Sequence, residues 1–205
     1  MRLLTGLAAV LFCVAGTIHA EDTAPADAAN DADTAKATVE FNGETLTLAW
    51  EDKDVFGDTI KEFIPADQTL DNWTRLAAEF EYPKIDDPRE FAEGMVEQLT
   101  KDNPKTEYEL LVNSESGEVI LDFVAYPEDG SYAEFDVFQY RKKDGGGLVA
   151  YQYALRAYGD AKEQFVTALD AEHRANLIVA LVEGAAKIRE QATEGDSETA
   201  ATETE

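Results

Sequence analysis

Three consecutive basic residues, Arg141, Lys142 and Lys143, stand just before a run of glycines at 145–147. Cationic side chains beside flexible backbone amides could bind an anion. A phosphate-binding loop, however, needs amides that converge at the start of a helix, and the residues after the glycines have the pattern of a strand. We therefore expect a hairpin turn at 143–147. Its basic residues are either a solvated tip or a contact for an acidic partner or headgroup.

His173 is the only histidine after residue 20, and the single cysteine, Cys13, lies before it. A zinc site needs three or four nitrogen, sulfur or carboxylate ligands, and the chain has neither an HExxH motif nor a cysteine pair. A serine hydrolase would depend on the same imidazole, and no serine has a GxSxG context. We interpret His173 as a surface residue of a helix. The sequence predicts no metal, no cofactor and no identifiable catalytic residue.

The abundant acids allow two further interpretations. Asp52, Asp54 and Gly57 imitate the start of an EF-hand loop, but Phe56 and Phe63 occupy positions where that loop needs ligands. A catalytic pair of carboxylates could also form in space, as in glycosidases. With so many acids the sequence singles out no pair. A small exported hydrolase using a carboxylate pair is therefore the alternative hypothesis.

The first twenty residues have the form of an export signal. Met1 and Arg2 precede an uncharged run at 3–18, and Ala20 offers a small residue for cleavage. An uncleaved anchor would need a longer apolar run. A lipoprotein would use Cys13, but the bulky Phe12 precedes it. We expect cleavage after Ala20, giving an exported bacterial protein, periplasmic or secreted, with no transmembrane segment and no thiol.

Charge restricts the partners. The chain has 43 acidic and 17 basic residues, a net charge of -26. The negative electrostatic field of such a chain repels phosphates and anionic lipid, so we expect no nucleic-acid binding. Cations, basic proteins and neutral ligands remain candidates, and a purely solubilising surface is the simpler interpretation. Composition indicates disordered acidic segments at 21–37 and 192–205, which flank a single domain at 38–191.

Periodicity and turn residues predict strands and helices within that domain. Asn42-Gly43 is typical of a two-residue hairpin turn. Asp87 and Pro88 are typical of a helix start, Asp160 with Glu163 resembles a capping box, and Asp170 could cap a second segment. The expected strands are 38–41, 45–50, 59–64, 74–82, 107–112, 118–126, 132–141 and 148–158, and the expected helices are 88–100 and 160–191, the second with a possible break near 170. Apolar residues 177, 178, 181, 182, 185 and 188 are expected to cover one face of the sheet.

These elements predict an α+β fold, an antiparallel sheet of paired hairpins packed between a mid-chain helix and a long C-terminal helix. Their order, with Trp73 after a turn and a terminal helix, resembles the Mog1/PsbP-like sandwich over 38–191. The resemblance implies a non-catalytic domain that docks on larger assemblies or supports envelope processes. The leading hypothesis is therefore an exported, non-enzymatic accessory or binding domain whose partner is another envelope protein.

Overall fold

Eight strands form one antiparallel sheet in the order β1-β2-β3-β4-β8-β7-β6-β5. The computed structural model describes residues 36–104 and 106–202, with side chains up to Arg189. The expected signal peptide 1–20 and nearly all of the expected linker 21–37 lie outside these residues. The strands are β1 Thr38–Phe41, β2 Glu44–Lys53, β3 Thr59–Ile64, β4 Arg75–Tyr82, β5 Tyr108–Val112, β6 Val119–Ala125, β7 Tyr132–Lys142 and β8 Leu148–Tyr158.

The turns confirm the hairpins predicted from the sequence. Asn42 and Gly43 have φ angles of 49° and 78°, and Phe41 pairs with Glu44 across this two-residue turn. Positive φ at both central residues gives the turn the twist of the flanking strands. In the hairpin of β7 and β8 the Lys143 amide donates to the Gly147 carbonyl at 2.9 Å. The glycines at 145–147 therefore close a strand hairpin, as expected.

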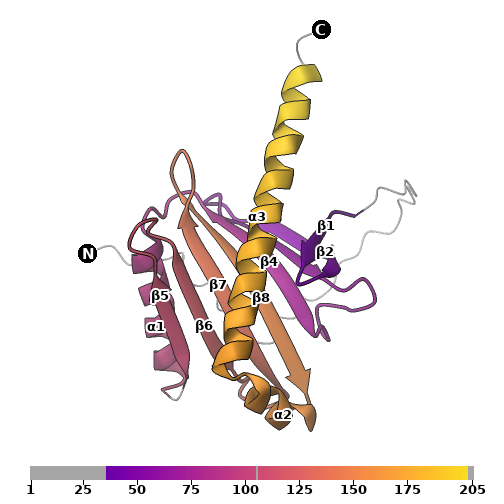
Figure 1. Cartoon of the computed structure of the whole chain (residues 1–205), viewed down its shortest axis with the longest axis vertical. Helices are drawn as coiled ribbons and strands as arrows, with labels where there is room; N and C mark the ends of the chain where they lie inside the picture. The colour runs from indigo at the N-terminus through magenta and orange to yellow at the C-terminus, as the bar shows by residue number, and fades with distance from the viewer. Residues whose placement is uncertain (1–35, 105, 203–205) are drawn as a thin grey trace.

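Two four-stranded meanders meet in the middle of the sheet (Figure 1). Strands β1 to β4 follow one another along the chain, and so do β5 to β8. The meanders join through antiparallel pairing of β4 with β8, from Arg75 opposite Leu155 to Tyr82 opposite Leu148. This leaves β1 and β5 as the two edges of the sheet.

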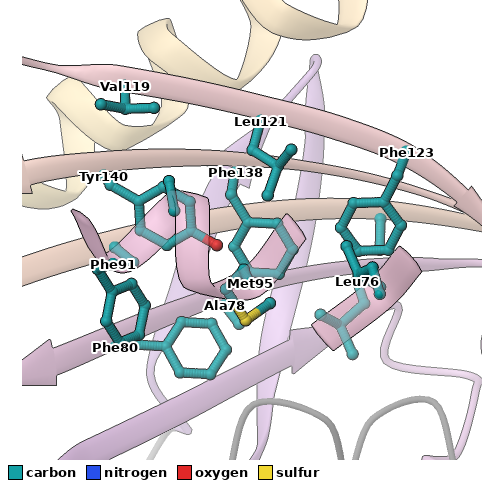
Figure 2. Packing of buried hydrophobic residues seen from close by; sticks show 14 of the residues in the cluster. Leu76, Ala78, Phe80, Phe91, Met95, Val119, Leu121, Phe123, Phe138 and Tyr140 are labelled. Atoms are coloured by element: carbon teal, nitrogen blue, oxygen red, sulfur yellow. The ribbon is translucent and has the colours of Figure 1, made fainter. Parts of the chain in front are cut away.

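Helix α1, Pro88–Asp102, packs on one face of the sheet against β5, β6 and β7. Asp87 caps it, because its carboxylate accepts hydrogen bonds from the amides of Arg89 and Glu90. Figure 2 shows the apolar layer beneath the helix. Phe91 lies edge-on to Tyr140 with ring centroids 5.5 Å apart, and Phe138 stacks beside Tyr140 at the same distance. The layer is completed by Leu76, Ala78, Phe80, Met95, Val119, Leu121 and Phe123.

The opposite face carries α2, Ala161–Ala168, and α3, Ala171–Thr202. Asp170 caps α3 by accepting from the His173 amide at 2.9 Å, which confirms the predicted break. The predicted cap at Asp160 is wrong, since its backbone is already helical and its side chain makes no capping hydrogen bond. Val182 was expected to face the sheet but is 38% exposed.

Helix α3 also continues to Thr202, whereas the sequence predicts a helix end near 191 and disorder from 192. Five of the eleven residues at 192–202 are alanine or glutamate, which are good helix formers, and the other six are threonine, glycine, aspartate or serine, which favour helices less. Residues 203–205 lie outside the described part of the chain.

The result is the expected α/β/α sandwich, but its second layer is incomplete. Helix α3 lies against β1, β7 and β8. Gly184 makes the contact with β1 close, because a Cβ there would lie 2.7 Å from the Phe41 ring. In Figure 1 the helix crosses in front of β8, and β5 and β6 lie to its side. On the α3 side, the β5 end of the sheet is therefore not covered by this helix.

Candidate functional site

The β7–β8 hairpin places charged residues on the face of the sheet that packs on α1. Alternate residues of a strand share a face, so Glu134 and Asp136 accompany Phe138 and Tyr140 into the core. Arg156 lies directly opposite Glu134. Glu134, Asp136 and Gln152 are each 3% exposed or less. Charged side chains are rarely buried to this degree unless they are paired.

Arg156 is held on several sides. Its guanidinium forms an ion pair with Glu134 and lies 3.8 Å from the ring centroid of Trp73 and 3.9 Å from that of Tyr132. It also donates a hydrogen bond to Tyr158, whose hydroxyl donates in turn to the Trp73 carbonyl at 2.9 Å. Cation–π contacts with two rings and an ion pair with a carboxylate hold this side chain in one place.

Burial disfavours a negative charge on both Glu134 and Asp136. Burial, followed by the charge of Asp136, raises the pKa of Glu134 well above its ordinary value. Burial also raises the pKa of Asp136 to about 6, although Gln152 donates to its Oδ1 at 2.6 Å. The two carboxyls hydrogen-bond to each other. A hydrogen bond between two carboxyls requires a proton on one of them, and no other described group donates to Glu134 Oε1 or Asp136 Oδ2. The charge of Arg156 opposes the effect of burial and lowers the pKa of both acids.

Access to this acid pair is closed. Glu134 and Asp136 are each 1% exposed, and the Arg156 side chain beside them is 7% exposed. Glycosidases hold their two carboxyl groups about 5 Å or more apart, on either side of a substrate in a cleft. Here the two carboxyl groups form a hydrogen bond with each other inside the core. The arrangement can stabilise the hairpin and fix Trp73, but it leaves no room for a substrate between the acids.

The three basic residues predicted from the sequence do not form a common surface. Arg141 lies 3.3 Å from Glu118, and Lys143 forms an ion pair with Glu81. Lys142 is exposed and forms no ion pair among the described residues. Arg141 and Lys142 are neighbours in a strand, so their side chains point to opposite faces of the sheet. These contacts leave Lys142 as the member of the triplet best placed to meet a partner.

The other sequence candidates occupy structural positions. His173 is exposed on α3, as predicted. Asp54 closes the turn between β2 and β3, since its Oδ1 accepts from the amides of Phe56 and Asp58 at 2.8 and 2.9 Å. Within 36–104 and 106–202 no cluster of three or more histidine, cysteine or acidic residues has the arrangement of a metal site.

A second feature lies at the edge of the sheet. Strand β5 has five residues, and three of them are large exposed apolar side chains, Tyr108 at 44%, Leu111 at 44% and Val112 at 42%. Edge strands are usually short, charged or covered, because their free backbone groups can pair with another chain. The other edge, β1, buries its apolar residues Val39 and Phe41 and lies against α3.

Sequence reasoning missed the buried cluster, although a signal was present. Strand 132–141 places Glu134 and Asp136 on the same face as Phe138 and Tyr140. Alternation along the strand therefore assigns two acids to the face that carries the core residues. Extending the predicted hairpin from its turn would have placed Arg156 opposite Glu134. The general abundance of acids hid this pattern.

Comparison with known proteins gives a family. A family model matches residues 34–185, and the chain belongs to that family, which is uncharacterised. A search of curated proteins finds no match. Among the helices of the described residues, none combines the length and apolar character needed to cross a membrane.

Proposed function

We propose that this protein is an exported, non-enzymatic accessory domain of the cell envelope that binds another protein. The observation that carries the proposal is the exposed apolar surface of β5. Three large apolar side chains on a five-residue edge strand would be a liability without a partner. The proposal that the protein is exported rests on the signal-like pattern of residues 1–20.

The buried acids favour binding over hydrolysis. Glu134 and Asp136 hydrogen-bond to each other and are covered by Arg156, so the described carboxyl pair with the most strongly shifted pKa values cannot receive a substrate. A relationship to Mog1/PsbP-like domains is part of the proposal and rests on the order of strands and helices. That resemblance implies docking on larger assemblies.

The basic triplet is a secondary contact in this proposal. Lys142 would approach an acidic group of the partner, since Arg141 and Lys143 already face Glu118 and Glu81. We expect Lys142→Glu to weaken partner binding less than a change in β5, because a single exposed charge contributes little.

Site-directed cross-linking in the producing cell tests the proposal. A photo-reactive phenylalanine analogue replaces Tyr108 in the full-length protein, and the same analogue replaces Phe56 as a control. Both residues are exposed, and Phe56 lies in the loop between β2 and β3, in the other half of the sheet. We expect one defined cross-linked protein from position 108 and none from position 56. Absence of any product from position 108, or identical products from both positions, would contradict the proposed function.

A further inference from the structure

We propose that β5 binds its partner by strand addition, and that the partner segment is extended, with apolar residues on one face and lysine or arginine opposite Glu107 and Glu109 on the other. This inference rests on the proposed function, because it specifies the surface and the chemistry of the protein that is bound.

The backbone of β5 offers a free row of hydrogen-bonding groups. At the two ends of the β5–β6 ladder, Val124 donates to the Glu107 carbonyl and Asn113 donates to the Glu118 carbonyl. Antiparallel ladders alternate, so odd-numbered residues from 107 to 113 turn their amides and carbonyls toward β6. The groups of Tyr108, Leu110 and Val112 therefore point away from the sheet. An incoming strand would form its ladder with these three residues.

The side chains beside this edge differ between the two faces. Tyr108 and Val112 are exposed on the α1 face, where Leu110 lies between them, partly buried against the core. Alternation places Glu109 and Leu111 on the α3 face, where α3 does not cover the edge (Figure 1). A strand laid along β5 would bury apolar residues against Tyr108 and Val112.

Charge selects the partner chemistry. Glu107 and Glu109 are exposed, and neither forms an ion pair among the described residues. Residues 106–118 contain no lysine or arginine, although Lys105 precedes them. Glu115 adds an acid at the hairpin turn, whereas Glu118 is paired with Arg141. Opposite charges on facing positions of an antiparallel pair are stabilising and like charges are destabilising. The edge therefore favours a basic, apolar segment, and repulsion between chains of net charge -26 opposes pairing with a second copy.

A synthetic peptide tests this mode directly. The probe is a capped seven-residue peptide that alternates valine and lysine, and its control alternates valine and glutamate. Each is titrated into the mature protein, and exchange of individual backbone amides is followed by NMR. We expect saturable binding of the lysine peptide, with slower exchange at Tyr108, Leu110 and Val112. The glutamate peptide should not bind.

Variants separate the contributions of backbone and charge. Val112→Pro removes an outward amide, and proline is tolerated at such positions of edge strands. Glu109→Lys reverses the selecting charge, and Glu128→Lys makes the same change at an exposed loop residue. We expect Val112→Pro and Glu109→Lys each to weaken binding of the lysine peptide about tenfold, which matches the loss of one hydrogen bond or favourable pair. Glu128→Lys should bind normally, and all three variants should keep the native circular dichroism spectrum.

Several results would overturn strand addition. These are failure of the lysine peptide to bind, binding without protection of the β5 amides, or equal binding by Val112→Pro. Protection that grows with protein concentration in the absence of peptide would assign the edge to a second copy. If the cell still yields a cross-linked protein from position 108 after any of these results, the proposed function stands and only the mode of binding is wrong.

Discussion

Arg156 and Glu134 lie opposite each other on β8 and β7 and form an ion pair in which both side chains are almost fully buried. The same guanidinium lies against the ring of Trp73, just before β4. In addition, the Arg156 amide donates to the Thr74 carbonyl at 3.1 Å. This one residue therefore ties the first meander of the sheet to the second.

Arg156→Met should lower the free energy of unfolding by about 3–5 kcal/mol, because removing one partner leaves an uncompensated charge on the buried acids. Urea denaturation of the variant measures the change. The control is Arg75→Met, which removes an ion pair with Glu44 between two partly exposed side chains. That change should cost less than about 1 kcal/mol. Equal losses for both variants would show that burial of the Arg156 pair does not matter.

The acid pair should make stability depend on pH. The pKa of Asp136 rises from 3.8 to about 6 on folding, so the folded state holds its proton where the unfolded chain releases it. The contribution is complete below about pH 4 and is lost as the pH rises through about 6. Relative to Asp136→Asn, the wild type should lose roughly 3 kcal/mol of unfolding free energy over this range, as an upper bound. A difference that stays flat with pH, or grows, would contradict the raised pKa of Asp136.

Gly184 should resist substitution even though it lies in a helix. Gly184→Ala adds a methyl group that would lie 2.7 Å from the Phe41 ring, between α3 and β1. We expect destabilisation of about 1–3 kcal/mol, against the gain of roughly 1 kcal/mol in helix propensity. Phe41→Leu in the same chain should reduce the additional cost of the alanine. A stabilised Gly184→Ala variant would mean that α3 lies farther from β1 than the structure has it.

The two candidate helix caps should behave differently. Asp87→Ala removes a side chain that accepts hydrogen bonds from two free amides of α1, and we expect a loss of about 1 kcal/mol in thermal unfolding experiments. Asp160 makes no capping hydrogen bond, so Asp160→Ala should change stability by less than about 0.5 kcal/mol. A larger loss for Asp160→Ala than for Asp87→Ala would mean that the Asp160 side chain caps α2 after all.

Local signals in the sequence were enough to predict most elements. Some residues strongly favour one backbone conformation, and such residues locate strand 59–64 and the turns at 42–43 and 143–147. The cap at Asp87 locates the start of α1. The pairing of β4 with β8 could not be predicted, because it joins segments far apart in the chain through shared burial. The capping box at Asp160 failed for a related reason, since a sequence motif does not fix the backbone angle of its first residue.

The candidate site was harder to predict. Exposed apolar residues on β5 look like an ordinary strand until the sheet order shows that β5 is an edge. The buried acids could be identified only from the strand register, because the register of β7 against β8 places Arg156 beside Glu134. Arg141 and Lys143 were singled out as basic, and their acidic neighbours Glu118 and Glu81 come from other strands.

We assign stability to the buried cluster and binding to the β5 edge, so one comparison tests both assignments. Arg156→Met and Val112→Asn are each examined for thermal unfolding and for cross-linking from position 108 in the producing cell. We predict that Arg156→Met unfolds at a lower temperature but still gives the cross-linked partner while folded. Val112 is exposed on the face that would meet the apolar residues of the partner, so Val112→Asn should unfold close to the wild-type temperature and lose the partner. A Val112→Asn variant that cross-links as well as wild type, or a folded Arg156→Met variant that does not, would contradict both assignments.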